Sequence, residues 1–236
     1  MELKLEHADC KWIDDKLFSE KFDDLYFSFE DGLAETKHVF IEGNMLGQRF
    51  KSLVDNQGFS IVETGFGSGL NFVATMQAWK EFAPDNAGKL KFYTVEKFPL
   101  TADQIQSVLA NWVELSEFSA TLVAAYPDNQ QGKCIIDFPE FNAELIIYFD
   151  DIDIMLADIP AEIDAWFFDG FAPEKNPKMW SGNLFRTARL KISKSGTVAT
   201  YTASGKIKKL FRENGFKIKR LPGFGKKWHM LRATPV

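Results

Sequence analysis

A glycine-rich segment constrains the fold of this chain more than any other feature of its sequence. The segment Glu63-Thr-Gly65-Phe-Gly67-Ser-Gly69 joins two runs of different periodicity. Residues 59–64 are β-branched and aromatic, as in a buried strand, whereas residues 70–82 carry apolar side chains at helical spacing. Glycines let the backbone turn tightly and approach a ligand, and the helix that follows offers free N–H groups. The pattern predicts a strand–turn–helix unit with a ligand at the turn, although a purely structural turn is the alternative.

The same alternation of strand-type and helix-type runs recurs along the chain. Further strand-type runs lie at 90–96, 144–149, 164–169 and 197–202, and a final pair lies at 216–221 and 228–233. Helix-type runs follow at 184–192 and 206–214. This order predicts a Rossmann-like α/β fold with a seven-stranded, mostly parallel sheet and a C-terminal antiparallel pair. We expect this domain at 58–236, preceded by an aromatic, acidic extension at 1–57 that forms a hairpin and a helix on the core.

The composition excludes several classes of protein. No apolar run reaches the roughly 18 residues that a membrane helix needs, and the first residues contain no apolar signal-peptide core. We therefore expect a cytoplasmic protein without membrane contact, in which Cys10 and Cys134 are free thiols. The histidines His7, His38 and His229 are scattered, so we expect no metal site.

The charge of the chain is distributed unevenly. The formal net charge is −5, yet residues 186–236 contain 14 Lys and Arg against one acid, Glu213. The rest of the chain is therefore strongly acidic. Such asymmetry can place a positive face beside a ligand site, although a lysine-rich solvated surface would give the same composition.

Acidic residues follow three of the predicted strands, at the edge of a parallel sheet where ligands bind. Glu96 ends the second strand, 27 positions after Gly69, where an acid can bond both ribose hydroxyls of a nucleoside. Asp150 and Asp151 end the third strand, where an acid either accepts a hydrogen bond from an adenine amino group or caps the next helix. Asp169 ends the fourth strand and is expected to face the reacting group, with a capping role as the alternative.

The loop after Asp169 has an unusual composition. Pro173 and Pro177 favour a shaped loop over a helix. Phe171 is a candidate for packing on a base or on a cofactor, whereas Trp180 is expected to lie in the core.

The same loop carries a resemblance to a known family. The segment DGFAPEKNPKMW at 169–180 resembles the methyltransferase domain of the bacterial MnmC-type enzymes that make 5-methylaminomethyl-2-thiouridine in tRNA. Similar segments are YFSFEDGLAETKHVFIEGN at 26–44, ETGFGSGLNF at 63–72, VEKFPL at 95–100, ATYTASGKIKKLFRENGF at 199–216 and GFGKKWHML at 223–231. The acid–x–Gly–x–Gly–x–Gly order of the glycine loop is also similar to the first motif of class I methyltransferases. The resemblance covers residues from about 26 to 233.

The resemblance implies an S-adenosylmethionine-dependent enzyme that methylates the amine of 5-aminomethyl(-2-thio)uridine at the wobble position, and it implies the anticodon arm of tRNA as partner. Many family members carry a second, FAD-dependent oxidase domain. This chain ends at Val236 without a second dinucleotide fingerprint, so we expect a stand-alone methyltransferase without flavin. Its aminomethyl substrate then comes either from a separate enzyme or from a pathway that installs ammonia directly. The alternatives are an N-methyltransferase for a small amine or a protein, and a non-catalytic RNA-binding module.

The resemblance favours Asp151 over Asp150 beside adenine. From its place at a strand end, Asp169 is the expected catalytic residue, which accepts a hydrogen bond from the amine and helps to collect its proton. The cofactor-binding set is Glu63, Gly65, Phe66, Gly67, Gly69, Asn71, Glu96, Lys97, Asp151, Asp169, Gly170 and Phe171. The expected tRNA contacts are Lys206, Lys208, Lys209 and Arg212 on one helix, with Lys226 and Lys227 on the last turn. Phe171 and Phe224 are candidates for stacking on the wobble base.

Overall fold

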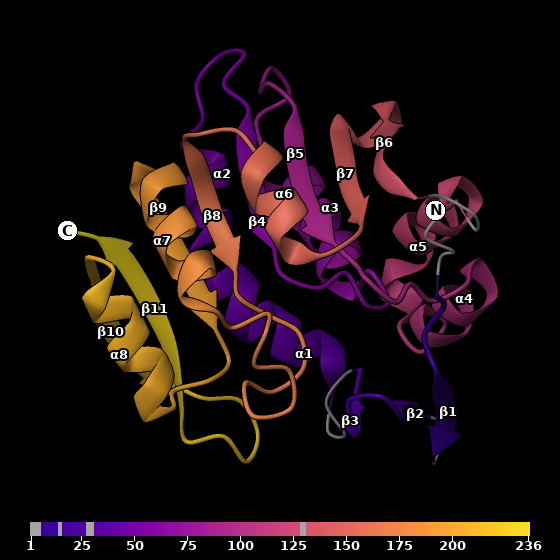
Figure 1. Ribbon diagram of the computed structural model, residues 1–236. Coiled ribbons are helices and arrows are strands. Elements are labelled where there is room, and N and C mark those ends of the chain that lie inside the picture. Colours follow the sequence, from indigo (N-terminus) through magenta and orange to yellow (C-terminus); the bar gives the residue numbers. More distant parts are fainter. Residues whose placement is uncertain (1–5, 14–15, 27–30, 128–130) are drawn as a thin grey trace.

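The computed structural model of the protein describes residues 6–13, 16–26, 31–127 and 131–236, so parts of the extension and of the family-like segment at 26–44 lie outside the described residues. An eight-stranded sheet forms the centre of the molecule in the order β10-β11-β9-β8-β4-β5-β7-β6 (Figure 1). Its strands are β4 (Phe59–Glu63), β5 (Leu90–Val95), β6 (Gly132–Phe138), β7 (Ala143–Phe149), β8 (Ile163–Phe167), β9 (Ile192–Thr200), β10 (Phe216–Pro222) and β11 (His229–Pro235). The neighbours from β9 to β7 pair in parallel, whereas β11 pairs antiparallel with β9 and β10.

All seven expected strands are present, and the α/β class with its antiparallel C-terminal pair is confirmed. The eighth strand, β6, pairs antiparallel with β7 at the edge of the sheet. It was not predicted because its outward positions include Lys133 and Asp137, while Ile135 on the same face is 58% exposed. An edge strand with one solvated face lacks the continuous apolar run by which the buried strands were found.

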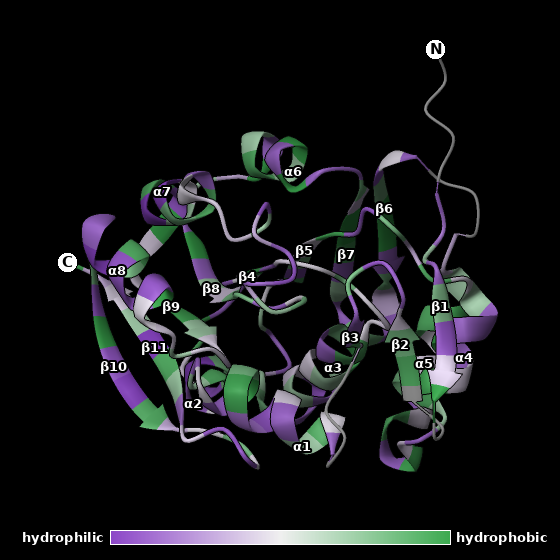
Figure 2. Ribbon diagram, turned by 60° about the horizontal axis from the view of Figure 1, so that its bottom comes forward, coloured by the Kyte–Doolittle hydropathy of each residue, from purple (hydrophilic) through white to green (hydrophobic). Residues whose placement is uncertain are grey.

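Helices cover both faces of the sheet (Figure 2). On one face lie α6 (Ile152–Asp158), α7 (Gly182–Lys191) and α8 (Gly205–Glu213). On the other lie α1 (Gly32–Thr36), the π-helix η1 (Lys37–Glu42), α2 (Leu46–Lys51), α3 (Leu70–Phe82) and α5 (Ser116–Ala125), with α4 (Ala102–Leu109) packed on α5. Two short 3-10 helices complete the described helices, η2 (Val113–Leu115) and η3 (Pro139–Phe141). None of the described helices is long and apolar enough to cross a membrane.

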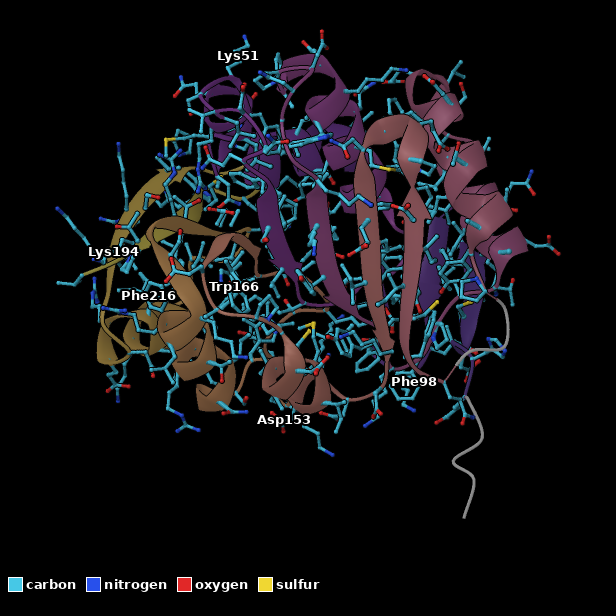
Figure 3. The ribbon with its side chains drawn as sticks, turned by 90° about the horizontal axis from the view of Figure 1, so that it is seen from above. Lys51, Phe98, Asp153, Trp166, Lys194 and Phe216 are labelled. Carbon is cyan, nitrogen blue, oxygen red and sulfur yellow. The ribbon has the colours of Figure 1, made fainter. Side chains whose placement is uncertain are left out.

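Strand β8 shows how the sheet separates two cores. Successive side chains of a strand point to opposite faces. Accordingly, Phe167 packs in the core with α3, whereas Trp166 and Phe168 pack in the core with α7 and α8. In Figure 3 Trp166 lies in the interior, while Lys51 and Lys194 lie at the periphery.

The described part of the extension is built around a small antiparallel sheet of β1 (Cys10–Ile13), β2 (Lys16–Ser19) and β3 (Asp24–Leu25). This sheet lies beyond the ends toward which β4, β5, β7 and β8 point (Figure 1). Leu17 of β2 and Leu33 of α1 belong to the same buried core as Phe72 of α3. The small sheet of the extension therefore packs at the end of the main sheet where its parallel strands finish, whereas its helices α1, η1 and α2 lie on one face of the main sheet.

Candidate active site

A pocket of about 740 Å³ opens at the carboxyl ends of β4, β5, β7 and β8. The predicted cofactor residues on its wall are Gly65, Phe66, Gly67, Asn71, Glu96, Lys97, Asp151, Asp169, Gly170 and Phe171. Glu63 and Gly69 do not line it; they support the wall from behind. The structure thus brings most of the predicted cofactor-binding residues together in one pocket, and these residues follow four different strands.

The glycine loop forms an open cradle on one side of the pocket. Gly65 has a φ of 95° and Gly67 a φ of 54°, which is backbone that glycine adopts without strain. A Cβ built on Gly67 would lie 3.5 Å from Cδ1 of Tyr26, and both residues line the pocket. Gly69, with a φ of 75°, begins α3 and packs against Leu122 instead.

Glu96 presents a partly buried carboxylate to the cradle. Its Oε2 accepts a hydrogen bond from the Gly67 N–H at 3.0 Å, and its Oε1 accepts one from the Phe98 N–H at 2.9 Å. Burial raises the pKa of Glu96, and these backbone donors oppose the rise. The two contacts fix both oxygens, and each oxygen keeps a further lone pair for a ligand hydroxyl.

Asp151 and Lys97 form a second polar pair on the wall. Lys97 Nζ lies 2.8 Å from Asp151 Oδ2, and this hydrogen bond lowers the pKa of Asp151. Asp151 also caps α6 by accepting a hydrogen bond from the Asp153 N–H. The capping role expected as an alternative is therefore present, and a role beside adenine stays a prediction.

Asp169 ends a chain of buried hydrogen bonds. Asn71 Nδ2 donates to Asp169 Oδ2 at 2.7 Å and to Glu63 Oε1 at 2.8 Å. Thr94 donates to the other Glu63 oxygen at 2.8 Å, and Thr36 donates to Asn71 Oδ1 at 2.7 Å. Glu63 is only 1% exposed, and burial, then the charge of Asp169, raises its pKa well above the ordinary value. Glu63 and Asn71 therefore hold Asp169 in place from behind.

Burial also raises the pKa of Asp169 to about 6, although the Asn71 donor and the Gly170 N–H lower it. The charge of Glu35 raises the same pKa further, and the charge of Lys227 lowers it. The Asp169 backbone is tied to β4, since its N–H donates to Thr64 Oγ1, and that hydroxyl donates to the Asp169 carbonyl, both at 2.9 Å. The result is a rigidly held carboxylate that titrates close to neutral pH.

Glu35, Tyr201 and Lys227 complete the wall on the side of Asp169. Lys227 Nζ lies 2.6 Å from Glu35 Oε1 and 4.2 Å from the centroid of the Tyr201 ring. The Tyr201 hydroxyl donates to the Gly170 carbonyl at 2.9 Å. The sequence does not predict Glu35 and Tyr201 as site residues, because Glu35 lies in the extension and Tyr201 falls inside the predicted strand 197–202.

Aromatic contacts close the pocket beneath the extension. Phe171 stacks on Phe22 with ring centroids 4.5 Å apart and meets Tyr26 edge-on at 5.3 Å. Asp24 accepts a hydrogen bond from the Ala172 N–H at 3.2 Å. Phe171 is thus engaged by the extension. Trp180 is 1% exposed, so its expected place in the core is confirmed.

The residues predicted to contact tRNA differ in their exposure and in their partners. On α8, Lys206, Lys209 and Arg212 are exposed and Lys208 is half-buried, and Lys209 Nζ lies 3.7 Å from Glu213. Lys226 is exposed on the turn between β10 and β11, whereas Lys227 is engaged on the pocket wall. In the described part of the chain, Lys206, Lys208, Arg212 and Lys226 have no carboxylate partner.

Most of the chain aligns with curated proteins of one family. It is 44% identical over 231 residues to the tRNA 5-methylaminomethyl-2-thiouridine biosynthesis bifunctional protein MnmC of Pseudomonas fluorescens strain Pf-5, covering 98% of this chain and 35% of the relative. It is 39% identical over 230 residues to the protein of the same name from Marinomonas sp. strain MWYL1, covering 96% and 34%. The chain therefore spans about a third of the length of these curated relatives.

A solved structure shares the fold. The crystal structure of MnmC2 from Aquifex aeolicus superposes with a TM-score of 0.76 at 19% identity, covering 97% of this chain and 70% of that one. A family model described as S-adenosyl-L-methionine-dependent methyltransferase matches residues 113–235, just over half of the chain. The chain therefore belongs to this family of methyltransferases, and S-adenosylmethionine is its methyl donor.

Proposed function

We propose that this protein methylates the exocyclic amine of 5-aminomethyluridine, or of its 2-thio form, at the wobble position of tRNA. The proposal rests on the acidic end of the pocket. There Asn71 orients the carboxylate of Asp169, and this carboxylate and that of Glu35 can both accept hydrogen bonds from an amine. The names of the MnmC relatives support the choice of tRNA as substrate.

The pocket residues fit S-adenosylmethionine. The backbone of Gly65 and Gly67 lies on the pocket wall, where it would pass the amino acid part, and the Glu96 carboxylate suits two ribose hydroxyls. Asp151 or Asp150, both on the wall, would accept a hydrogen bond from the adenine amino group. When bound, this cofactor supplies an electrophilic methyl group on a sulfonium.

Asp169 would orient the amine and take up its proton. A primary alkylamine is protonated near neutral pH and then has no lone pair to donate. A carboxylate with a pKa of about 6 is a better proton acceptor than an ordinary aspartate, and it is aimed by Asn71. The amine remains the stronger base, so positioning is the larger part of this role.

The exposed basic residues of α8 and Lys226 would contact the phosphates of the anticodon arm. Such contacts give salt-sensitive affinity that is largely independent of sequence. The acceptor uridine must already carry its aminomethyl group, so we also propose that a separate enzyme supplies it, in the cytoplasm.

The first experiment is the transfer of labelled methyl from S-adenosylmethionine to bulk tRNA from cells that lack this modification, followed by nucleoside analysis. A product one methyl heavier than 5-aminomethyluridine or its 2-thio form supports the proposal. Methylation of a small amine or a protein, with none of tRNA, would overturn the choice of substrate but leave the family unchanged.

Replacing Lys208 and Lys209 by Glu should weaken tRNA binding by at least about tenfold at moderate salt, since each substitution reverses a charge on α8. The affinity for S-adenosylmethionine should not change. A matched control is the Lys51→Glu, Lys194→Glu double variant, whose residues lie at the periphery in Figure 3 and do not line the pocket. Equal tRNA affinity in both double variants would exclude α8 as the docking helix.

Trp228 is a stronger candidate for stacking on a base than Phe171 or Phe224. It is 89% exposed in the basic turn that also carries Lys227, and the sequence pattern had placed it at the start of a strand. Stacking of one base on an aromatic ring contributes about 1–3 kcal/mol, so Trp228→Ala should raise KM for tRNA about tenfold. Trp12→Ala, at a partly exposed position on β1, is the control in steady-state kinetics. Equal KM values in the two variants would remove Trp228 from the interface.

A further inference from the structure

An alkylammonium group of the protein itself occupies the acidic end of the pocket. The Lys227 ammonium is paired with Glu35 at 2.6 Å and lies over the Tyr201 ring at 4.2 Å. The Glu35 side chain is only 15% exposed, whereas that of Lys227 is 45% exposed. A carboxylate and an aromatic face within the same pocket thus already hold a primary ammonium.

Three separate segments assemble this arrangement. Glu35 lies on α1, Tyr201 follows β9, and Lys227 lies on the turn between β10 and β11, which sits beside α1 in Figure 2. The turn is anchored there by a hydrogen bond between His38 Nε2 and the Pro222 carbonyl at 2.9 Å. The position of Tyr201 is fixed by its hydrogen bond to Gly170, next to Asp169.

The chemistry of the pair matches the proposed acceptor. A lysine ends in a methylene and an ammonium, and an aminomethyl substituent on uracil ends in the same two groups. Both are protonated near neutral pH. A carboxylate forms a charge-assisted hydrogen bond with such a cation, and an aromatic ring attracts it through its face.

We propose that Glu35 and Tyr201 form a binding subsite for the protonated aminomethyl group of the acceptor, and that Lys227 occupies this subsite until the acceptor displaces it. This inference rests on the proposed function for the identity of the acceptor. The subsite lies close enough to Asp169 that the charges of Glu35 and Lys227 both affect that carboxyl.

Displacement of Lys227 is compatible with its surroundings. Its side chain has a flexible four-carbon stem and is 45% exposed. An incoming ammonium replaces one positive charge by another, so the carboxylates of the pocket keep a counter-ion throughout. The released Lys227 is then free to contact a phosphate of the RNA, which is the role predicted from the sequence.

The test uses ethylammonium as a probe of the subsite in the intact chain. Lys227→Met removes the ammonium and keeps an apolar stem, so an intramolecular competitor for the subsite is lost. In an NMR titration at constant ionic strength, this variant should bind ethylammonium about tenfold more tightly than the wild type. The Lys227→Met, Glu35→Gln double variant should lose the gain. Lys194→Met removes a lysine outside the pocket and should leave the affinity unchanged.

Ethylammonium affinity that is the same in the wild type and in Lys227→Met, or that survives in the double variant, would overturn the subsite. In methyl transfer to tRNA, Glu35→Gln should raise KM for the acceptor about tenfold with a smaller change in kcat and none in cofactor affinity. Thermal unfolding of each variant checks that it is folded. If the wild type does not methylate tRNA, the proposed function fails, while the ethylammonium titration still decides the subsite.

Discussion

Replacing Asp169 by Asn is expected to lower the rate of methyl transfer by about 100- to 10,000-fold, the usual range for loss of a positioned acid or base. An amide has nearly the shape of the carboxylate and can still accept the hydrogen bond from Asn71, but it cannot take up a proton or pair with an ammonium. Single-turnover rates with saturating S-adenosylmethionine measure the effect. Asp85→Asn, an exposed aspartate in the loop between α3 and β5, is the control. Near-normal transfer by Asp169→Asn at every pH would remove Asp169 from the chemistry.

The pH dependence follows from the pKa of about 6 at Asp169. The ionised form accepts the proton, so wild-type activity should be kept above about pH 6 and fall as the pH drops through that value. The Asn variant should lack this acidic limb. Because folding raises this pKa above its ordinary 3.8, the ionised carboxylate destabilises the folded state, and this effect grows as the pH rises from about 4 to about 6. The Asn variant should therefore unfold at a temperature no lower than the wild type at pH 7, which separates lost chemistry from lost folding.

Replacing Glu96 by Gln is expected to raise the Kd for S-adenosylmethionine about 10- to 100-fold. Hydrogen bonds to charged groups contribute about 1.5–3 kcal/mol each, and the amide can accept at only one of its two ends. Its NH2 group would face either the Gly67 N–H or the Phe98 N–H, so a donor would meet a donor inside the pocket wall. Calorimetric titration with S-adenosylmethionine measures the change.

Glu140→Gln is the matched control for Glu96, since Glu140 is exposed in η3, before β7, and does not line the pocket. It should bind the cofactor as the wild type does. A wild-type Kd in Glu96→Gln, with the variant folded, would show that the ribose hydroxyls are held elsewhere.

The sheet edge was the most predictable part of the site. The glycine loop, Glu96 and Asp169 each follow a buried strand. Because the carboxyl ends of parallel strands lie along the same edge of a sheet, residues that follow such strands lie close together. Their convergence on a single pocket follows directly from strand order and pairing. Glu63 and Gly69 were expected on the wall but lie behind it, because the Glu63 side chain is buried and Gly69 is buried at the start of α3.

The acceptor side of the pocket could not be predicted from local pattern. Glu35 and Lys227 are separated by 192 positions in the chain, yet they form an ion pair in the wall of the pocket. Asn71 was expected to bind cofactor, and the structure shows it also bridging two carboxylates. Trp228 was placed in a strand because apolar residues follow it, whereas its side chain is in solvent.

The sequence by itself determined the α/β class, the positions of the seven predicted strands and the residues at their carboxyl ends. It could do so because burial on both faces of a parallel sheet leaves continuous apolar runs, and because tight turns need glycine. Only the tertiary structure decided how the extension covers the pocket, which carboxylate is held by Asn71, and where Lys227 rests. These contacts join residues distant in the chain, and no local periodicity encodes which of them meet.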